Sequence, residues 1–375
     1  MELNESVLKR EEKAVFALRG LYQKFGYAQY KMSKFEEYDL YVRNKDFLVS
    51  ENIITFTDTD GKLMALKPDV TLSIIKNTKD EPGLVQKLYY NENVYRVSKG
   101  THSFKEIMQA GLECIGDIDG YSIFETVMLA AKSLETIAPD YILDISHMGI
   151  VTAVIELLGE SFEQKDAVLK CIAEKNTHTI LSLCEEAGVD KKAAKSVVEL
   201  TKTYGKPDEV IEKLKSMGGN EKFMQALSEL EQLVSLLKGC GITDKIHIDF
   251  SVVNDMNYYN GVVFKGFVNG IPTGILSGGQ YDKLLQKMGR KSGAVGFAVY
   301  LDLLERLSEP EEKYDVDTVV LYDKHADFGA LSSAVRMLTD NGKSVTALKS
   351  VPEKLRFRQL LKLNERGLEI LENNG

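Results

Sequence analysis

The amino-acid sequence predicts an α+β fold: an antiparallel sheet with helices, a helical insertion and a small α/β unit near the C-terminal end. Three observations lead to this class. Runs that alternate apolar and polar residues are joined at Asp60-Gly61 and Asn269-Gly270, which are strong hairpin signals. Nothing alternates between about residues 150 and 240. No GxGxxG or GxxxxGKS/T sequence is present to indicate a doubly wound nucleotide-binding fold.

The elements before the insertion follow from these patterns. Helical spacing predicts a first helix that ends at Gly26, and a polar loop joins the two strands of a second antiparallel pair. In order, we expect a helix over residues 4–25, a hairpin over 53–66, paired strands at 84–97 and 104–116, and a helix over 122–136.

The insertion is predicted to be entirely helical. Its last helix carries one apolar stripe, closed by glycines: Phe223, Leu227, Leu230, Val234 and Leu237. Behind it we expect strands at 246–252 and 262–268, and a helix from about Val295 to Leu307.

The charged linker SEPEEKYD marks a domain boundary. The expected organisation is a core over residues 1–308, with the helical insertion at 150–240, and a short domain over 314–375. The short domain reads as strand, helix, strand and final helix.

Composition excludes several classes of function. A formal net charge of −9 and a pI near 5.3 argue against broad nucleic-acid binding, which needs a positive field. The four cysteines are widely spaced and predict reduced thiols, with neither a disulfide frame nor a metal site. The N-terminal segment is charged and helix-like, and no apolar run approaches the ~18 residues that a membrane span needs. We therefore expect a cytoplasmic protein.

Two adjacent tyrosines, Tyr258 and Tyr259, stand between the strands at 246–252 and 262–268. Adjacent residues on a strand point to opposite faces, so one ring is expected in the core and the other at a surface or pocket. This pair is the first candidate for a binding site.

Lys67, Pro68 and Asp69 follow a strand, and Thr71 is placed to cap the next helix. Two interpretations of Asp69 are open. It is either a solvated or capping acid at a strand-to-helix turn, or the carboxylate that holds a ligand's ammonium group.

Gln109, Gly111 and Glu113 fall on one face of an extended strand. Glycine between two polar residues leaves room for a ligand against the backbone. A polar outer face with a bulge explains the pattern equally well.

Arg96 ends a strand before a loop that bears Lys99, His102 and Lys105. An arginine there suits bidentate binding of phosphate or carboxylate. The alternative is an exposed basic loop without a ligand.

Together these stretches resemble the catalytic core of class II aminoacyl-tRNA synthetases, specifically histidyl-tRNA synthetase, over the chain up to Leu307. The stretch TFTDTDGKLMALKPDVT is similar to the family's TFxDxxGxxLALRPExT. The stretch from LYYNENVYR to QAGLECIG resembles motif 2, and MNYYNGVVFKGF resembles the histidine-specific L-D-Y-Y-x-x-x-x-F. The stretch SGGQYDKLL…GAVGFAVYLDLL resembles motif 3, GGRYDxLL…AVGFAxGxERL.

The resemblance implies a pocket for histidine. Tyr258 and Tyr259 would enclose the imidazole ring, Gln109 and Glu113 would also hold the amino acid, and Asp69 would meet the α-ammonium group. An ammonium group favours a carboxylate, and an imidazole favours aromatic walls with a hydrogen-bonding partner.

The chain departs from the synthetase pattern where phosphate chemistry needs fixed cations. Asn254 stands where the synthetases have the arginine before the tyrosine pair, and Leu303 stands at the motif 3 arginine. Gln280 replaces the arginine of GGRYD, and Ser33 aligns with the motif 1 proline. Loss of one charge-stabilising donor typically costs ~10²–10³ in rate, so the loss of two predicts no adenylation. Arg96 and Lys105 would then be the remains of a nucleotide or phosphate site.

A histidine pocket without ATP and tRNA machinery resembles the regulatory subunits of ATP phosphoribosyltransferase, a family similar to histidyl-tRNA synthetase. That resemblance implies a non-catalytic protein without catalytic residues, cofactor or metal. It also implies activation of a short-form catalytic subunit in the first step of histidine biosynthesis, and a part in feedback by histidine. The expected partners are that subunit, free histidine and a second copy of the chain, around residues 30–35, within a hetero-oligomer. A membrane is not expected as a partner, nor is tRNA, because the terminal domain looks like a truncated anticodon-binding domain. A diverged active synthetase and a stand-alone histidine-binding protein are the alternatives.

Overall fold

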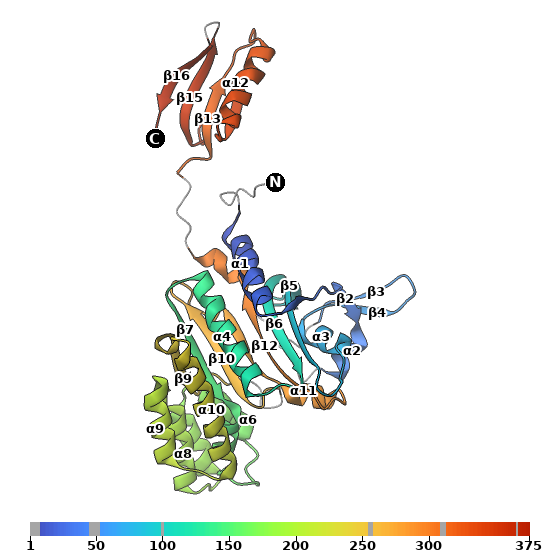
Figure 1. The fold of residues 1–375 in the computed structure, drawn as a ribbon, viewed down its shortest axis with the longest axis vertical. Helices are drawn as coiled ribbons and strands as arrows, with labels where there is room; N and C mark the ends of the chain where they lie inside the picture. The colour runs from blue at the N-terminus through green and yellow to red at the C-terminus, as the bar shows by residue number, and fades with distance from the viewer. Residues whose placement is uncertain (1–7, 45–52, 99–100, 254–257, 308–312, 365–366) are drawn as a thin grey trace. The chain divides into compact units, whose positions relative to one another are not determined.

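The computed structural model describes residues 8–44, 53–98, 101–253, 258–307, 313–364 and 367–375. They form two compact units, Met1–Leu307 and Ser308–Gly375, each with its own sheet (Figure 1). Within the described residues, no helix is both long and apolar enough to span a membrane. The same residues hold no group of three or more His, Cys, Asp or Glu side chains suited to a metal ion. The four cysteines are free thiols.

The first unit is built on a sheet of nine described strands. Neighbours pair antiparallel through its centre, whereas β1 with β5 and β7 with β9 pair in parallel, so the sheet is mixed. In spatial order the strands are β1 (Ala28–Gln29), β5 (Val85–Val97), β6 (Phe104–Gly116), β12 (Gly293–Tyr300), β11 (Leu276–Gln280), β10 (Val262–Val268), β7 (Tyr141–His147), β9 (Ile246–Asp249) and β8 (Tyr204–Gly205).

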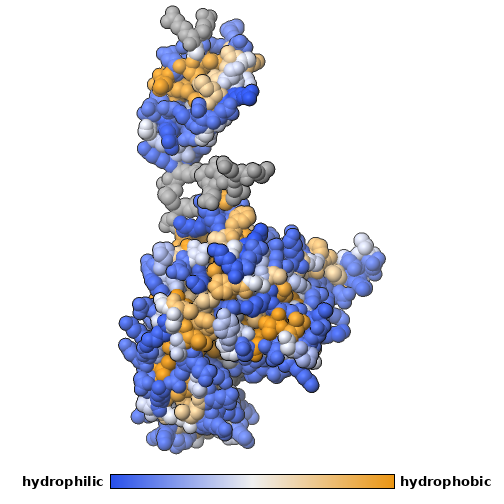
Figure 2. All heavy atoms as spheres, viewed as in Figure 1, coloured by the Kyte–Doolittle hydropathy of each residue, from blue (hydrophilic) through white to orange (hydrophobic). Residues whose placement is uncertain are grey.

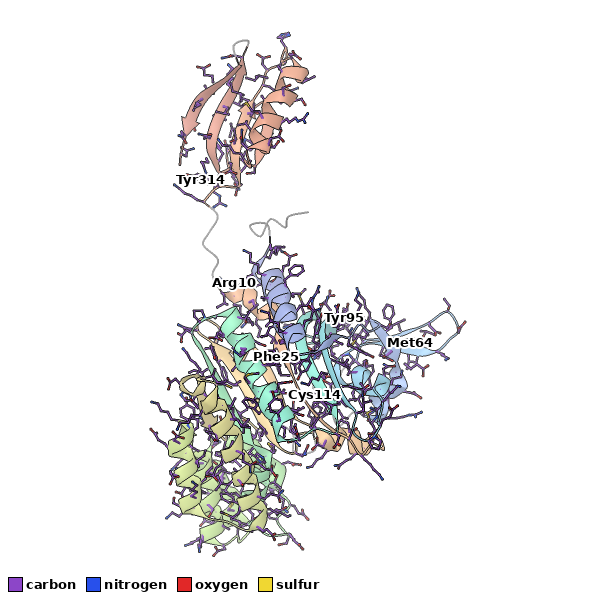
Figure 3. The ribbon with its side chains drawn as sticks, in the orientation of Figure 1. Arg10, Phe25, Met64, Tyr95, Cys114 and Tyr314 are labelled. Atoms are coloured by element: carbon purple, nitrogen blue, oxygen red, sulfur yellow. The ribbon has the colours of Figure 1, made fainter. Side chains whose placement is uncertain are left out.

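One face of this sheet is covered by helices, including α1 (Arg10–Lys24) and α4 (Gly120–Ile137), as Figure 1 shows for α4. Strand β6 turns Leu112 and Cys114 toward this face, where both are fully buried in the first unit; Cys114 is labelled in Figure 3. The helix α4 begins where the Asp119 side chain accepts a hydrogen bond from the Ser122 N–H at 2.9 Å. The helices α1 and α4 do not cover the opposite face of the sheet.

The insertion is helical as predicted, except for the two-residue strand β8, which pairs with β9. The whole predicted stripe of α10 is buried. The helices are α5 (Met148–Glu156), α6 (Lys165–Ala173), α7 (Thr177–Glu186), α8 (Lys191–Thr201), α9 (Pro207–Met217) and α10 (Glu221–Gly239), followed by a 3₁₀ turn at Thr243–Lys245.

A small sheet of β2 (Phe35–Glu37), β4 (Leu63–Leu66) and β3 (Thr55–Thr57) joins the first unit through the helices α2 (Tyr38–Arg43) and α3 (Thr71–Asn77). The predicted hairpin at Asp60-Gly61 is present as a five-residue turn. The Asp58 carboxylate accepts the N–H groups of Asp60 and Lys62, and Gly61 has a φ of +81°. Phe35 and Phe56 lie 5.2 Å apart between ring centroids on this sheet and are partly exposed. Figure 2 shows hydrophobic residues at the surface where the sheet projects.

The helix expected from Val295 to Leu307 is wrong. Residues Gly293–Tyr300 form β12, between β6 and β11, and a 3₁₀ helix over Leu301–Arg306 follows. A central strand buried on both faces is a continuous apolar run, which its spacing alone does not distinguish from a buried helix. A short helix, α11 (Asp282–Lys287), precedes it.

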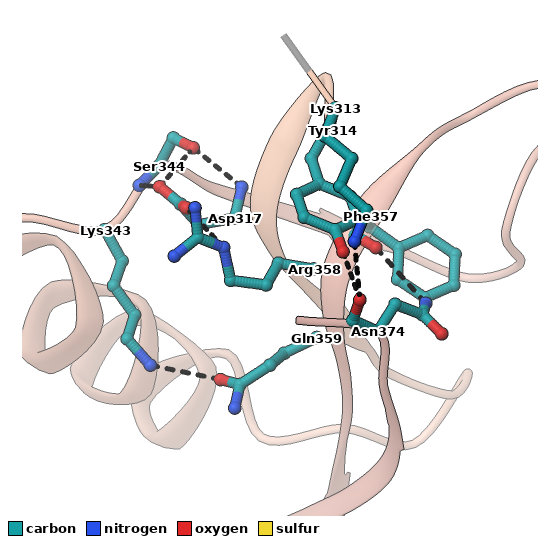
Figure 4. A network of polar contacts seen from close by, with 9 residues as sticks. All are labelled: Lys313, Tyr314, Asp317, Lys343, Ser344, Phe357, Arg358, Gln359 and Asn374. Carbon is teal, nitrogen blue, oxygen red and sulfur yellow. Dashed lines mark hydrogen bonds and ion pairs between the residues drawn. The ribbon is translucent and has the colours of Figure 1, made fainter.

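The second unit has a sheet in the order β14 (Val345–Leu348), β13 (Val316–Leu321), β15 (Phe357–Asn364) and β16 (Gly367–Asn373), with the helix α12 (Phe328–Asp340). Polar contacts tie its two ends together: Lys313 and Tyr314 both donate to the carbonyl of Asn374 (Figure 4). In the same network the Asp317 carboxylate accepts the N–H and the hydroxyl of Ser344, at 3.0 and 2.9 Å.

The final helix predicted for this unit is also wrong, because its residues form the strands β15 and β16. The charged, leucine-rich sequence suits a helix by propensity. Pairing overrides it: β15 lies parallel to β13 on one side and antiparallel to β16 on the other, which buries Leu360 and Leu361.

Candidate functional site

The candidate site lies on the sheet face that α4 leaves uncovered. Register places Glu113 of β6 beside Gly296 of β12, which in turn pairs with Gly279 of β11. Two residues before Glu113 on β6, Gly111 pairs with Tyr90 of β5. Two residues before Gly111, Gln109 pairs with Tyr300 of β12. The predicted face of Gln109, Gly111 and Glu113 therefore exists, and Gln109 and Glu113 are buried rather than solvated.

Glycines make room for the larger groups on this face. A Cβ atom on Gly296 would lie 1.8 Å from the Glu113 carboxylate, and one on Gly111 would lie 2.5 Å from the Tyr90 hydroxyl. The space that the sequence assigned to a ligand over Gly111 is thus occupied by the Tyr90 side chain and the Phe297 carbonyl oxygen. The glycine serves close packing in the chain itself.

Glu113 is the central acceptor of the site. Its two carboxylate oxygens accept one hydrogen bond from the Thr71 hydroxyl, at 2.8 Å, and one from the Tyr281 hydroxyl. Burial raises the pKa of Glu113 to about 8; the bonds from Tyr281 and Thr71 oppose the increase, and the charge of Asp69 adds to it. A carboxyl group with this pKa is mostly protonated at neutral pH and ionises as the pH rises through about 8.

Three tyrosine rings surround this carboxylate. The ring of Tyr258 lies 4.5 Å from that of Tyr259 and 5.7 Å from that of Tyr281, between centroids. The Tyr259 ring also covers Gly279, where a Cβ atom would approach it to 2.7 Å. The site therefore has aromatic walls around the Glu113 carboxylate.

The premise that Tyr258 and Tyr259 lie on a strand is wrong. Both belong to the connection between β9 and β10, so the alternation of a strand does not separate them. Both rings are partly buried, and both pack on the cluster that includes Tyr90 and Tyr281.

Asp69 lies between β4 and α3, beside the same carboxylate. Its Oδ1 accepts the N–H of Leu72 at 2.9 Å, so it caps the first turn of α3. Burial raises the pKa of Asp69, opposed by the bond from Leu72 and by the charge of Arg96. Thr71, expected as the cap, is instead the first residue of α3 and bonds to Glu113.

Arg96 and Lys105 face each other directly across β5 and β6. Arg96 donates from Nε to the carbonyl of Pro68 at 3.1 Å, and Lys105 is exposed. Two like charges opposite one another are destabilising unless an anion lies between them. Lys99, the third cation expected here, lies outside the described residues.

Sequence reasoning missed three residues of the site: Tyr281, Tyr90 and Lys67. Tyr281 stands inside the stretch SGGQYDKLL, so that motif contained a signal for it. Lys67 is fully buried and donates from Nζ to the carboxylate of Glu92 at 2.6 Å. Glu92 in turn lies directly opposite Gln109 in the pairing of β5 with β6. A buried lysine leaves no pattern in the sequence that separates it from an exposed one.

The structure also locates most of the departures from the synthetase pattern. Leu303 packs against the core on the 3₁₀ helix, and the Gln280 amide donates to Asp282 at 2.7 Å. Ser33 accepts the N–H of Phe35 at 3.1 Å. Asn254 lies outside the described residues. Neither Gln280 nor Leu303 supplies a cation to the site.

Comparison with protein families matches residues 1–304 to the family described as histidyl-tRNA synthetase. Among curated proteins, the ATP phosphoribosyltransferase regulatory subunit of Caldanaerobacter subterraneus subsp. tengcongensis is 32% identical, over 78% of this chain and 78% of its own length. The protein of the same name from Thermoanaerobacter sp. is 31% identical, over 90% of this chain and 88% of its own.

Solved structures share the fold. A protein from Bacillus halodurans, described as an ATP phosphoribosyltransferase regulatory subunit/histidyl-tRNA synthetase, has a TM-score of 0.76 at 24% identity and covers 94% of this chain and 93% of its own. Histidyl-tRNA synthetase from Nostoc sp. has a TM-score of 0.71 at 20% identity, over 94% and 87%. A chain of the ATP phosphoribosyl transferase (HisG:HisZ) complex from Thermotoga maritima has a TM-score of 0.62 at 19% identity, over 78% and 97%.

Proposed function

The chain belongs to the histidyl-tRNA synthetase-like family of ATP phosphoribosyltransferase regulatory subunits, non-catalytic proteins of histidine biosynthesis, and on that basis we propose that it binds free histidine. The proposed site is the pocket around Glu113. The observation that carries this proposal is the buried Glu113 carboxylate, oriented by Thr71 and Tyr281, among three tyrosine rings.

The chemistry of histidine fits this arrangement. The imidazole ring offers an N–H donor and an apolar face, which match the Glu113 carboxylate and the rings of Tyr258 and Tyr259. Asp69 supplies a second carboxylate for the α-ammonium group, and the buried Gln109 amide supplies hydrogen bonds for the remaining polar atoms. Asp69 also caps α3, so its two roles share one side chain.

Adenylation is not part of the proposal. Gln280 and Leu303 are neutral at two positions where the synthetase pattern has arginine, and Asn254 is a third such position by sequence. Histidine-dependent exchange of pyrophosphate into ATP, at the rate of a synthetase, would contradict this part and favour a diverged active synthetase. Arg96 and Lys105 are proposed as the remains of the phosphate site.

The proposed partner is the short-form catalytic subunit of ATP phosphoribosyltransferase, which this chain would activate. The relatives' name and the Thermotoga maritima complex support this partner. Feedback by histidine then follows if histidine binds two states of the complex with different affinity, because such a difference is a coupling free energy. A stand-alone histidine-binding protein would neither co-purify with the catalytic subunit nor raise its activity.

A homodimer within the hetero-oligomer is also proposed. Apolar side chains reach the surface on the small sheet that follows residues 30–35: Phe35, Phe56 and Leu63 are 46%, 38% and 49% exposed. An exposed apolar patch of this kind is typical of an interface. Sedimentation at micromolar concentration tests it, and a monomer there would contradict the dimer.

We also propose that the protein is cytoplasmic, since the cytoplasm is the usual compartment of histidine biosynthesis. Its second unit is proposed as a truncated anticodon-binding domain, without tRNA as a partner.

The decisive experiment combines binding and activation. Calorimetry with free histidine above pH 8, where the Glu113 carboxyl is ionised, is expected to give saturable binding, weakened by about 10- to 100-fold in Glu113→Ala because a charge-assisted hydrogen bond is lost. Addition of the protein to a short-form catalytic subunit is expected to raise its phosphoribosyltransferase rate. Histidine binding that is absent, or indifferent to Glu113, would leave the pocket without the proposed role.

A further inference from the structure

We infer that Asn260, Gln280 and Asp282 form a hydrogen-bonded clamp that sets the geometry of the histidine pocket without contacting the ligand. This inference rests on the proposed function for its ligand. The clamp joins two chain segments, one with Tyr258 and Tyr259 and one with Tyr281; its members Asn260 and Asp282 are 22 residues apart in sequence.

The geometry of the clamp is reciprocal. Asn260 donates from Nδ2 to Asp282 Oδ2 at 2.9 Å, and its Oδ1 accepts the N–H of Asp282 at 2.8 Å. Gln280 donates from Nε2 to the same Oδ2 at 2.7 Å, and its carbonyl accepts the N–H of Asn260 at 3.1 Å. The remaining oxygen, Oδ1, accepts the N–H of Ala294 at 2.8 Å. One carboxylate thus holds both segments and the start of β12.

The clamp lies directly beside the tyrosines. Asn260 follows Tyr259, and Tyr281 stands between Gln280 and Asp282. Any displacement of Asn260 relative to Asp282 therefore changes the distance between the paired tyrosines and the ring that bonds Glu113. These side chains act through the tyrosines, so they are positioning residues.

Close packing fixes the two segments at this distance. A Cβ atom on Gly261 would lie 2.0 Å from Oε1 of Gln280, and the carbonyl of Gly261 accepts the N–H of Met148 at 2.8 Å. The segment is thus tied to β11 on one side and to the start of α5 on the other. A binding site is precise when its supporting side chains are themselves held by hydrogen bonds.

The arrangement also gives Gln280 a role of its own. Its amide donates to a carboxylate, so the isosteric change Gln280→Glu removes the donor and brings two carboxylates together. The change Asn260→Ala removes both side-chain bonds of Asn260 and leaves its backbone bond intact. The two variants break the clamp by different means.

The test compares these variants with a matched control. Asn176→Ala removes a similar bond, from Asn176 Oδ1 to the N–H of Thr179 at 3.1 Å, in the helical insertion. Binding of free histidine is measured by calorimetry, stability by thermal melts, and the tyrosine cluster by near-ultraviolet circular dichroism. The chain has no tryptophan, so tyrosine dominates that signal.

We expect Asn260→Ala and Gln280→Glu to weaken histidine binding by about ten-fold or more, since each loses one or two hydrogen bonds that orient the pocket. Both should change the tyrosine dichroism, whereas Asn176→Ala should change neither histidine binding nor the tyrosine dichroism. Histidine binding equal to wild type in both folded clamp variants overturns the clamp and leaves the proposed function intact. If the wild type binds no histidine, the proposed function fails, and the clamp is then judged by the tyrosine dichroism alone. A change of the spectrum confined to the clamp variants supports the clamp, and an unchanged spectrum overturns it. If Asn260→Ala is unfolded, Gln280→Glu decides alone.

Discussion

The two faces of β6 differ in chemistry although both are buried. Leu112, on the helix-covered face, is fully buried and meets apolar side chains from the helices and neighbouring strands. Gln109 and Glu113, on the opposite face, are 4% and 2% exposed and meet tyrosines, a threonine hydroxyl and charged groups. One strand therefore contributes to the apolar core on one side and to the proposed histidine pocket on the other.

This difference teaches that burial alone does not identify a core. Apolar burial lowers the free energy of the folded state roughly in proportion to area, whereas a buried carboxylate raises it unless every oxygen is hydrogen-bonded. Glu113 is retained in an environment that raises its pKa to about 8. Such a group is typical of a functional site.

The largest expected effect is on the helix-covered face. Leu112→Ala should lower the free energy of unfolding by about 2–5 kcal/mol, because it leaves a cavity in a packed core. Chemical denaturation of the variant checks this. Histidine affinity, measured where the variant is folded, should stay near wild type; a large loss of affinity would mean that the two faces are not independent.

On the pocket face, Glu113→Gln should reverse this pattern. Histidine binding, measured above pH 8 where the Glu113 carboxyl is ionised, should weaken by about 10- to 100-fold, since the acceptor proposed for the imidazole loses its charge. Thermal stability should be retained or increased, because a carboxyl group that is costly to ionise becomes a neutral amide. Melts beside calorimetry give both numbers, and a strongly destabilised variant would assign Glu113 to structure.

The pH dependence of stability should carry the signature of the same residue. Because the pKa of folded Glu113 is raised from 4.5 to about 8, the folded state holds one more proton than the unfolded state between these values. Stability should therefore fall as pH rises through this window and level off above it. Glu113→Gln should make the curve of melting temperature against pH flatter, leaving the contributions of Asp69 and Asp144, whose pKa values burial also raises. An unchanged slope would contradict the assignment.

The smallest loss of histidine affinity is expected from Gly279→Ala. The added Cβ atom would lie 2.7 Å from the Tyr259 ring and 2.8 Å from the carbonyl oxygen of Val262, so both the ring and the backbone of β10 must move. Histidine affinity should fall by a few-fold, and the melting temperature should fall as well, because the backbone cannot relax as easily as a side chain. Gly20→Ala, which has open space around its Cβ position, is the control for histidine affinity; it lies inside α1, where alanine should raise stability slightly.

The parts of the fold that local pattern specifies could be predicted from the sequence. The stripe of α10 and the strands β5 and β6 follow from spacing and from turn residues. The helix expected at Val295 and the final helix could not, because pairing in a sheet decides both segments and no local pattern records the partner strand.

The same limit applies to the candidate site. Asp69, Gln109, Glu113 and the tyrosine pair could be named because motifs contain them, and register brings Gln109 and Glu113 to one face. The bond from Thr71 to Glu113 and the clamp on Asp282 connect residues that only the folded chain places together. Orientation within a site depends on such tertiary contacts, which a single sequence does not display.

The pairing of β5 with β6 has a consequence for the order of folding. The two strands align over their full thirteen residues across a short loop, so the contacts between them are local in sequence. Glu113 meets Thr71 across 42 residues, and it meets Tyr281 across 168. Closing a long loop costs more entropy than closing a short one, and contacts of high sequence separation slow folding. The hairpin can form early as a local unit. The pocket is complete only when β11, which follows the helical insertion in the sequence, has joined the sheet. A chain in which the insertion has misfolded would therefore have the strand that carries Glu113, but it would lack the complete pocket, because Tyr281 would not reach Glu113.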